Sequence, residues 1–350
     1  MTNANGVERL KVRGGVFPLE DVTASLSSSD VSIWTSWTSN IAAVYGFRSA
    51  RSALRYTLES RNSGRVWLPA YCCTEIVDAL AGLPIEICFY AVSDLLAPDV
   101  DYLDEHLQPG DAVVGINYFG RPMDDEWLQL VHGHVDVLWI EDCAQCLTPH
   151  KVQWSMVRIY SPRKLVGVPD GGILVDIGGI LSPPVLRAQS SDALLRPYLL
   201  RKQDPDGYQH DVWYPKFKYA ESLMFASDIK ISEYTEKRLR HKALVSVLNP
   251  RRNNYAALYR KLSEIALWKF EQPNWAPLGF PILVKDASEL AARLASEKIF
   301  APRHWAVLPK SEYSVNLSET AGGLLTLPCD QRYDERDMEE VARAVLTAIT

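Results

Sequence analysis

Short apolar runs alternate with amphipathic segments between residues 48 and 176, and this pattern predicts strands that alternate with helices. The predicted strands are apolar throughout, as burial of both sheet faces requires. The alternation therefore predicts an α/β fold with a mainly parallel sheet flanked by helices. The predicted helices are Arg48–Leu58, Cys73–Leu83, Leu103–Leu107 and Asp124–Val131. The predicted strands are Val66–Leu68, Ile85–Tyr90, Ala112–Tyr118, Val135–Ile140, Val157–Tyr160 and Gly172–Val175.

The segments before and after this region differ from it in composition and in hydrophobic pattern. Residues 1–30 are expected to form an N-terminal arm with a Ser-rich patch at 25–29. Leu194–Tyr219, rich in Arg, Lys, Tyr and Pro, is expected to be irregular or interface structure, and long helical stretches follow within Asp228–Leu262. The last part predicts a strand at Phe280–Val284 and helices at Ala287–Ile299 and Glu335–Ile349, the latter capped by Asp334. We expect a large domain over 1–245 and a smaller C-terminal α+β domain over 246–350.

Composition and charge exclude several classes of protein. A net charge of -6 argues against a nucleic-acid partner, because neutralising phosphates needs a basic face. There is no run of 18 apolar residues, so no membrane span is expected. The first 15 residues lack the apolar core of a secretory signal, so a cytoplasmic protein is expected.

The six cysteines have no disulfide-framework spacing, which fits a reduced compartment. Cys143-x-x-Cys146 suggests zinc or redox chemistry, but no second ligand pair stands at short spacing, so small buried residues are the favoured interpretation. We therefore expect no metal site.

An acidic pair follows the predicted strand that ends at Ile140. Asp142 stands at the strand end and Gln145 follows it three residues later. An enzyme that uses pyridoxal 5′-phosphate (PLP) needs a carboxylate against the pyridine nitrogen, so that the ring can accept electrons. Asp142 is a candidate for this role, and a helix N-cap is the ordinary alternative.

A lysine stands just after another predicted strand. Lys164 follows Val157–Tyr160 and precedes Gly171-Gly172. A lysine that forms a Schiff base must be held in place with its amine deprotonated, and burial beside cations lowers its pKa for that purpose. Ser161, three residues earlier, could donate its hydroxyl to a phosphate. A surface lysine near a turn is the alternative.

A predicted helix begins with small residues and a cation. Ala50, Arg51 and Ser52 stand at its start, where free backbone N–H groups can bind a phosphate and Arg51 can add charge. An ordinary capped helix has the same composition. The order of these three features along the chain is more specific than any one of them.

This order resembles the fold-type I PLP enzymes, and more closely the DegT/StrS family of sugar-nucleotide aminotransferases. The resemblance covers about residues 45–176, and a weaker match spans Leu327-Pro328 through Met338. Its motifs are similar to Trp67–Tyr71, Tyr118–Pro122, Glu141-Asp142-Cys143-Ala144-Gln145, and Lys164 through Asp170-Gly171-Gly172. It implies the fold-type I architecture, PLP as cofactor and a homodimer.

The resemblance also implies roles for individual residues. Lys164 would carry PLP as a Schiff base and shuttle protons, Asp142 would pair with the pyridinium, and Gln145 would lie near the ring or its O3′. Ala50, Arg51 and Ser52 would hold the phosphate, with Ser161 as a further contact. The implied reaction moves an amino group from a glutamate-like amino acid to a keto group, that of a nucleotide-linked sugar.

The sequence departs from the family pattern at the cofactor. Ile159 stands where the family has a serine five residues before the lysine. Cys73 stands where many members stack an aromatic ring on the cofactor, and Tyr71 is the candidate to reach the ring instead. The family's Asn-x-Arg-Met segment is not recognisable after Gly172.

Other functions stay open on the sequence. A PLP-dependent lyase or dehydratase is one alternative, although such members typically have His where Lys164 stands. A non-catalytic PLP-fold binding protein is another. A Rossmann-like nucleotide binder or glycosyltransferase is disfavoured, because no Gly-x-Gly-x-x-Gly follows the first strand. His304-Trp305 and Trp213–Tyr219 are weaker candidates for substrate contacts, with structural and interface roles as their alternatives.

Overall fold

A sheet of seven strands in the order β2-β8-β7-β6-β5-β3-β4 forms the centre of the molecule. The computed structural model describes residues 11–21, 26–27, 29–39, 41 and 43–349, so much of the predicted N-terminal arm, with Ser25 and Ser28 of its Ser-rich patch, lies outside the described residues. The strands are β2 (Ala43–Phe47), β3 (Arg65–Pro69), β4 (Glu86–Tyr90), β5 (Ala112–Ile116), β6 (Leu138–Cys143), β7 (Val157–Tyr160) and β8 (Gly172–Asp176).

The sheet is mainly parallel, as predicted. Strands β4, β3, β5, β6 and β7 pair in parallel, whereas β8 runs antiparallel to both β7 and β2. Residues 161–171 connect β7 to β8, and such a connection is too short for the crossover that a parallel neighbour needs. Reversal of β8 brings its first residues back to the end of β7.

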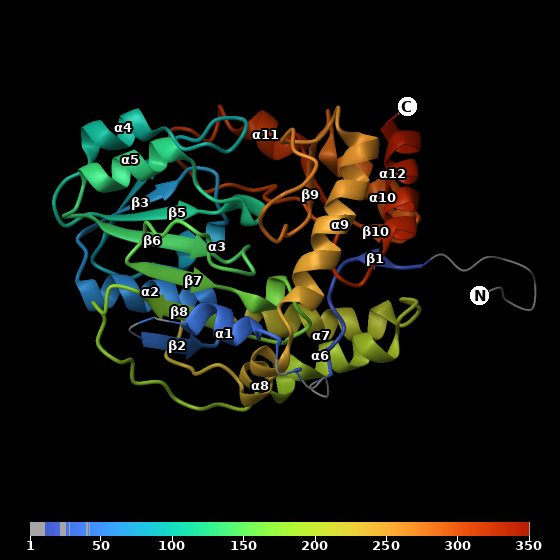
Figure 1. The fold of residues 1–350 in the computed structure, drawn as a ribbon, viewed down its shortest axis with the longest axis horizontal. Coiled ribbons are helices and arrows are strands. Elements are labelled where there is room, and N and C mark those ends of the chain that lie inside the picture. The colour runs from blue at the N-terminus through green and yellow to red at the C-terminus, as the bar shows by residue number, and fades with distance from the viewer. Residues whose placement is uncertain (1–10, 22–25, 28, 40, 42, 350) are drawn as a thin grey trace, which may run out of the picture.

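Helices cover the sheet. In the first half these helices are α1 (Ile33–Thr38), α2 (Ala50–Arg61), α3 (Thr74–Ala79), α4 (Val100–His106) and α5 (Asp125–Gly133). Trp127 of α5 packs edge-on against Trp139 of β6, with ring centroids 5.4 Å apart, so α5 covers the face to which Trp139 points. Figure 1 shows α4 and α5 together at the β3 end of the sheet, with α2 near β7 and β8.

A second hydrophobic cluster lies in the last hundred or so residues of the chain. It joins Tyr255, Phe280, Leu290 and Val341. The elements here are α9 (Val245–Leu262), β9 (Phe280–Leu283), α10 (Ala287–Ser296), β10 (Ile299–Phe300), α11 (Ser318–Gly323), β11 (Leu324–Leu327) and α12 (Glu335–Ile349). As predicted, the Asp334 carboxylate caps α12 by accepting the Asp337 N–H at 3.1 Å. The domain boundary near residue 245 stays a prediction.

The segment Leu194–Tyr219 is helical, so the expectation of irregular structure was wrong, while an interface role stays a prediction. It contains most of α6 (Asp192–Gln203) and α7 (His210–Ser222), which pack on each other and lie beside α8 (Glu233–His241) in Figure 1. Packing of Leu194 against Ala220 and Met224 stabilises this helix pair despite Pro197 and Pro215 within it, so tertiary contacts outweigh local propensity.

Several short elements were not predicted from the sequence. Strand β2 and helix α1 were not predicted, and β6 begins three residues later than Val135. The N-terminal β1 (Arg13–Gly14) pairs in parallel with β10, so the start of the described chain lies beside its last part (Figure 1). Within the described residues, none of the helices combines the length and the apolar content needed to cross a membrane.

Candidate active site

A cavity of about 930 Å³ opens where the central parallel strands end. Val114 of β5, Ile140 and Asp142 of β6, and Ile159 and Ser161 at the end of β7 all line it. Alternate residues of a strand point to the same face, and register pairs Val114 with Ile140 and Asp142 with Ile159. The cavity therefore lies over one face at the carboxyl ends of the strands, where open α/β sheets bind ligands.

Asp142 and Glu141 point to opposite faces of β6. The Asp142 side chain lines the cavity and accepts the Ala144 N–H at 2.7 Å. Burial raises the pKa of Asp142, while the charge of Lys164 opposes that shift. Glu141 is fully buried on the other face, where it accepts hydrogen bonds from Arg158 Nε at 2.5 Å and Asn117 Nδ2 at 2.8 Å. Of the two neighbouring carboxylates, only Asp142 is available to a ligand.

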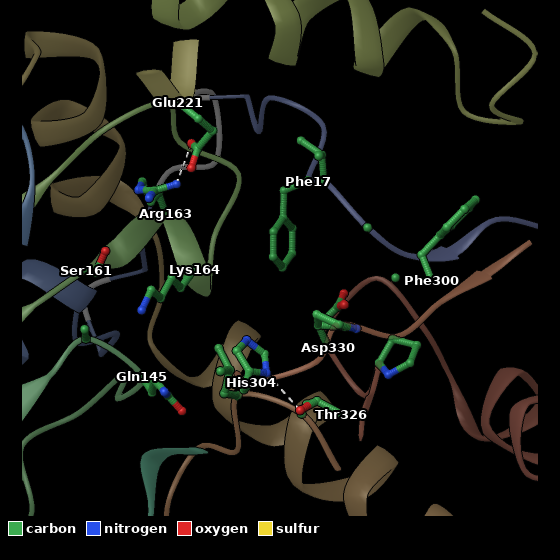
Figure 2. Close-up of a pocket in the computed structure, with 18 of the residues that line it drawn as sticks. Phe17, Gln145, Ser161, Arg163, Lys164, Glu221, Phe300, His304, Thr326 and Asp330 are labelled. Carbon is green, nitrogen blue, oxygen red and sulfur yellow. Dashed lines mark hydrogen bonds and ion pairs between the residues drawn. The ribbon is translucent and has the colours of Figure 1, made fainter. Parts of the chain in front are cut away.

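Lys164 ends a single 3-10 turn, Pro162–Lys164, that follows β7. Burial lowers the pKa of its amine, an effect that Asp142 opposes. The nearby guanidinium groups of Arg163 and Arg51 lower the pKa further. In Figure 2 the side chain points into the cavity, above Gln145 and beside His304. A half-buried amine with a lowered pKa near a carboxylate is suited to nucleophilic and proton-transfer chemistry.

The start of α2 lies directly against β8. Ser49 caps the helix by accepting the Ser52 N–H at 3.2 Å, and the amides of Ala50 and Arg51 have no acceptor within the helix. A Cβ atom at Gly172 would lie 2.1 Å from the Ser49 carbonyl carbon and 2.3 Å from the Ala50 nitrogen. Glycine at 172 is therefore what allows this helix terminus to stand at the wall of the cavity.

The predicted phosphate contacts are only partly brought together. Ala50, Arg51 and Ser161 line the cavity. Ser52 does not, because its hydroxyl accepts the Ser227 N–H at 3.0 Å and lies 3.0 Å from the Ser49 hydroxyl. The Arg51 guanidinium is also engaged: it donates to the Met224 carbonyl at 2.9 Å and pairs with Glu75.

A backbone amide in the loop after the neighbouring strand β5 orients Gln145. Its Oε1 accepts the Phe119 N–H at 2.6 Å, which leaves the Nε2 amino group as its free donor toward the cavity. Phe119 holds this position in a left-handed conformation, with φ 53°. Gln145 is therefore a hydrogen-bond donor to whatever occupies the space below Lys164 (Figure 2).

Tyr71 lies behind the cavity rather than in it. Its hydroxyl donates to the His304 carbonyl at 2.5 Å and accepts the Trp305 N–H at 3.2 Å. His304 and Trp305 themselves line the cavity. Burial lowers the pKa of His304 to about 3, helped by the charge of Lys164, so its imidazole is neutral. Its Nδ1 lies 2.8 Å from the Thr326 hydroxyl (Figure 2).

Cys73 lines the cavity, and its position at the face of a cofactor ring stays a prediction. Trp213 also lines it, with Tyr214 and Phe217 of α7, so this segment faces the site and is not simply interface. Cys143 and Cys146 are both buried, and Cys146 Sγ lies 3.7 Å from His150 Nε2. Among the described residues, no group of three or more His, Cys, Asp or Glu side chains is arranged to hold a metal ion.

Sequence reasoning missed several cavity residues that come from distant parts of the chain. Figure 2 shows Phe17 directed into the cavity and an ion pair between Arg163 and Glu221 above Lys164. The Arg163 Nη1 to Glu221 Oε1 distance is 2.7 Å. Only the position of Arg163 next to Lys164 signalled a role, because nothing local in the sequence links α7 to the lysine loop.

Solved structures show where this architecture occurs. CalS13, a sugar aminotransferase from Micromonospora echinospora, matches with a TM-score of 0.63 and 17% identity over 97% of this chain and 99% of its own. PseC of Helicobacter pylori, an aminotransferase involved in the biosynthesis of pseudoaminic acid, matches with a TM-score of 0.65 and 14% identity over 97% and 99%. The PLP form of Spr1654 from Streptococcus pneumoniae matches with a TM-score of 0.65 and 13% identity over 97% and 100%.

The chain has the fold of the sugar aminotransferases. This confirms the predicted fold-type I architecture of a mainly parallel sheet flanked by helices. No protein-family model and no curated protein matches the sequence.

Proposed function

We propose that this chain is a PLP-dependent aminotransferase that transfers an amino group from an amino-acid donor to a keto acceptor. The observation that carries the proposal is the placement of Lys164 and Asp142 in one buried cavity, each close enough to shift the pKa of the other. The similarity to aminotransferases of the same fold supports it.

The residues of the cavity fit PLP. Asp142 offers a half-buried carboxylate for the pyridine nitrogen, and Gln145 offers a free amide donor. Ala50 and Arg51 offer N–H groups without intrahelical acceptors, and the buried Ser161 hydroxyl has no hydrogen-bond partner among the described residues. When bound, PLP supplies an electron sink for carbanion chemistry at the donor's Cα.

The chain's own residues supply attachment and proton transfer. Because the pKa of Lys164 is lowered, a larger fraction of its amine is neutral and able to attack an aldehyde. The same amine can take a proton from Cα of the amino-acid donor once that donor is held beside it. Asp142 would place negative charge against the pyridine nitrogen of bound PLP, and the neutral His304 lines the same cavity without adding charge.

The proposal also covers the two substrates, the oligomeric state and the compartment. The solved neighbours are named sugar aminotransferases, and we propose a nucleotide-linked keto sugar as acceptor and a glutamate-like donor. We also propose a homodimer in the cytoplasm. Exposed large apolar side chains on and near α7, at Tyr208, Val212, Tyr219 and Phe225, are a surface for a second copy.

Spectroscopy of the purified protein with PLP tests the attachment. We expect an absorbance band near the visible edge that borohydride removes, with the reduced adduct located on Lys164 by mass spectrometry. Lys164→Ala should lack the band, whereas Lys230→Ala, a change at a half-exposed lysine on the surface, should keep it. The same spectrum in Lys164→Ala would refute the proposal.

Addition of amino acids separates transamination from other PLP chemistry. Loss of the band with glutamate, and its return with a keto acid, is the expected result. Retention of the lysine-bound cofactor with no amino transfer to any acceptor would point instead to a lyase or a non-catalytic binding protein.

A further inference from the structure

Two arginines converge with Lys164 on one wall of the cavity, and each is paired with a glutamate from a different helix. Arg51 at the start of α2 pairs with Glu75 of α3. Arg163, next to Lys164, pairs with Glu221 of α7 at 2.7 Å. Arg51, Arg163, Glu75 and Glu221 all line the cavity. The wall therefore carries two guanidinium groups, each occupied by a carboxylate that another anion could displace.

The arginine pair stands where the cavity already offers hydrogen-bond donors to an anion. The free amides of Ala50 and Arg51 begin α2 beside it. Ser161 is only 3% exposed, and its hydroxyl has no hydrogen-bond partner among the described residues. Ile159, by contrast, contributes no polar group at the end of β7. The amide and hydroxyl donors that a phosphate needs are present here, and the Arg163 guanidinium lies beside them.

We propose that Arg163 binds the phosphate of the cofactor together with Arg51, and that Glu221 is the carboxylate that holds Arg163 until the phosphate displaces it. This inference rests on the proposed function, since it assumes that PLP is the ligand. A phosphate near neutral pH carries up to two negative charges and three acceptor oxygens, so it competes well against one carboxylate for a guanidinium. Before the phosphate binds, the Glu221 carboxylate balances the charge of the Arg163 guanidinium, because an unpaired charge at this position is costly.

Displacement of Glu221 needs only a turn of its side chain, because α7 itself stays packed on α6 through a buried cluster and a ring contact between Tyr198 and Phe217. The buried cluster that joins α6 to α7 and the residue just after it contains Leu194, Ala220 and Met224, with Leu223 partly buried. Glu221 itself is 30% exposed, so its carboxylate can turn toward water without moving the sheet. A phosphate can thus take the place of Glu221 while the cavity keeps its shape.

Comparison of PLP with pyridoxal, which has the same ring and aldehyde but no phosphate, tests the inference. We would measure the affinity of each for the full-length protein by absorbance titration, with borohydride trapping and mass spectrometry as a second readout. Arg163→Gln is expected to weaken PLP by about tenfold or more, the size of a lost charge-assisted hydrogen bond, with pyridoxal unchanged. Arg163→Lys should recover part of the loss.

Glu221→Gln keeps the arginine and removes the competing charge. PLP should then bind more tightly than to the wild type, roughly threefold or more, with no change for pyridoxal. Arg187→Gln is the matched control, because Arg187 forms a similar pair with Asp228 on the surface at 2.6 Å, away from the cavity. It should leave both affinities unchanged.

Four results would overturn the inference. Equal weakening of PLP and pyridoxal in Arg163→Gln would show a structural role for the arginine. If neither affinity changes in Arg163→Gln or Glu221→Gln, Arg163 does not contact the phosphate. If neither affinity changes but the KM for glutamate rises in Arg163→Gln, Arg163 binds the carboxylate of the amino-acid donor. In all of these the wild type still attaches PLP at Lys164, so the proposed function stands. If the wild type attaches neither aldehyde, both proposals fail together.

Discussion

Gly172 and Ser49 lie so close that a Cβ atom at position 172 would come within 2.1 Å of the Ser49 carbonyl carbon and oxygen. The contact joins the first residue of β8 to the cap of α2. It sets how far the helix terminus stands from Lys164, because β8 is also paired with β7, from which the lysine loop departs.

Gly172→Ala should therefore force β8 and α2 apart. We expect a loss of about 1–3 kcal/mol in the free energy of unfolding, the usual cost of overpacking, together with weaker PLP binding. Urea unfolding and absorbance titration measure the two effects. Gly133→Ala, with nothing within 4 Å of the added Cβ atom, is the control and should behave as the wild type. A stable Gly172→Ala protein with full PLP affinity would contradict the close contact.

Asp142→Asn should separate cofactor attachment from amino transfer. The amide has nearly the same shape but no charge to place against the pyridine nitrogen. Lys164 should still hold PLP, while the rate of the half-reaction with glutamate falls by about 100-fold or more, the order of other contributions from a catalytic carboxylate. Single-turnover absorbance measures this rate. An unchanged rate would exclude Asp142 from the chemistry.

Glu141→Gln, one residue away, should lower stability and leave the rate of the half-reaction unchanged. Glu141 lies on the far face of β6 and its partner Arg158 is buried, so the change leaves a buried cation without its counter-charge. We expect a loss of about 3–5 kcal/mol in the free energy of unfolding. The rate of the half-reaction per folded molecule should stay within about twofold of the wild type, because Glu141 is not in the cavity. Loss of rate without loss of stability would contradict the placement of Glu141.

Acid should destabilise the protein partly through His304. Its pKa is lowered from 6.5 to about 3 in the folded protein, so between these values the unfolded chain binds a proton that the folded chain does not. The contribution of the neutral imidazole to the free energy of unfolding is complete above about pH 6.5. It is lost as the pH falls below this value, by up to about 1.4 kcal/mol per pH unit. Urea unfolding from pH 7 to 4 should show a steeper decline for the wild type than for His304→Asn. Equal slopes would show that His304 is not a buried neutral imidazole.

The sequence predicted what local patterns encode and missed what distant segments build. Apolar runs identified six of the seven sheet strands, and the strand-end positions of Asp142 and Lys164 placed both in one cavity. Partners such as Glu221 could not be predicted, because the approach of α7 to the lysine loop depends on tertiary packing. The Ser52 hydroxyl looked available for a phosphate, yet its bond to the Ser227 N–H is set by a segment 175 residues away.

Tyr71→Phe tests whether Tyr71 reaches the cofactor or supports the cavity from behind. The hydroxyl holds the His304 carbonyl and the Trp305 N–H, and its removal leaves both backbone groups without this partner. We expect a loss of about 1–3 kcal/mol in the free energy of unfolding, the cost of unsatisfied buried polar groups. PLP affinity should stay within about twofold of the wild type, because Tyr71 does not line the cavity. Absorbance titration alongside urea unfolding distinguishes the two roles, since a cofactor contact would lower PLP affinity with little change in stability.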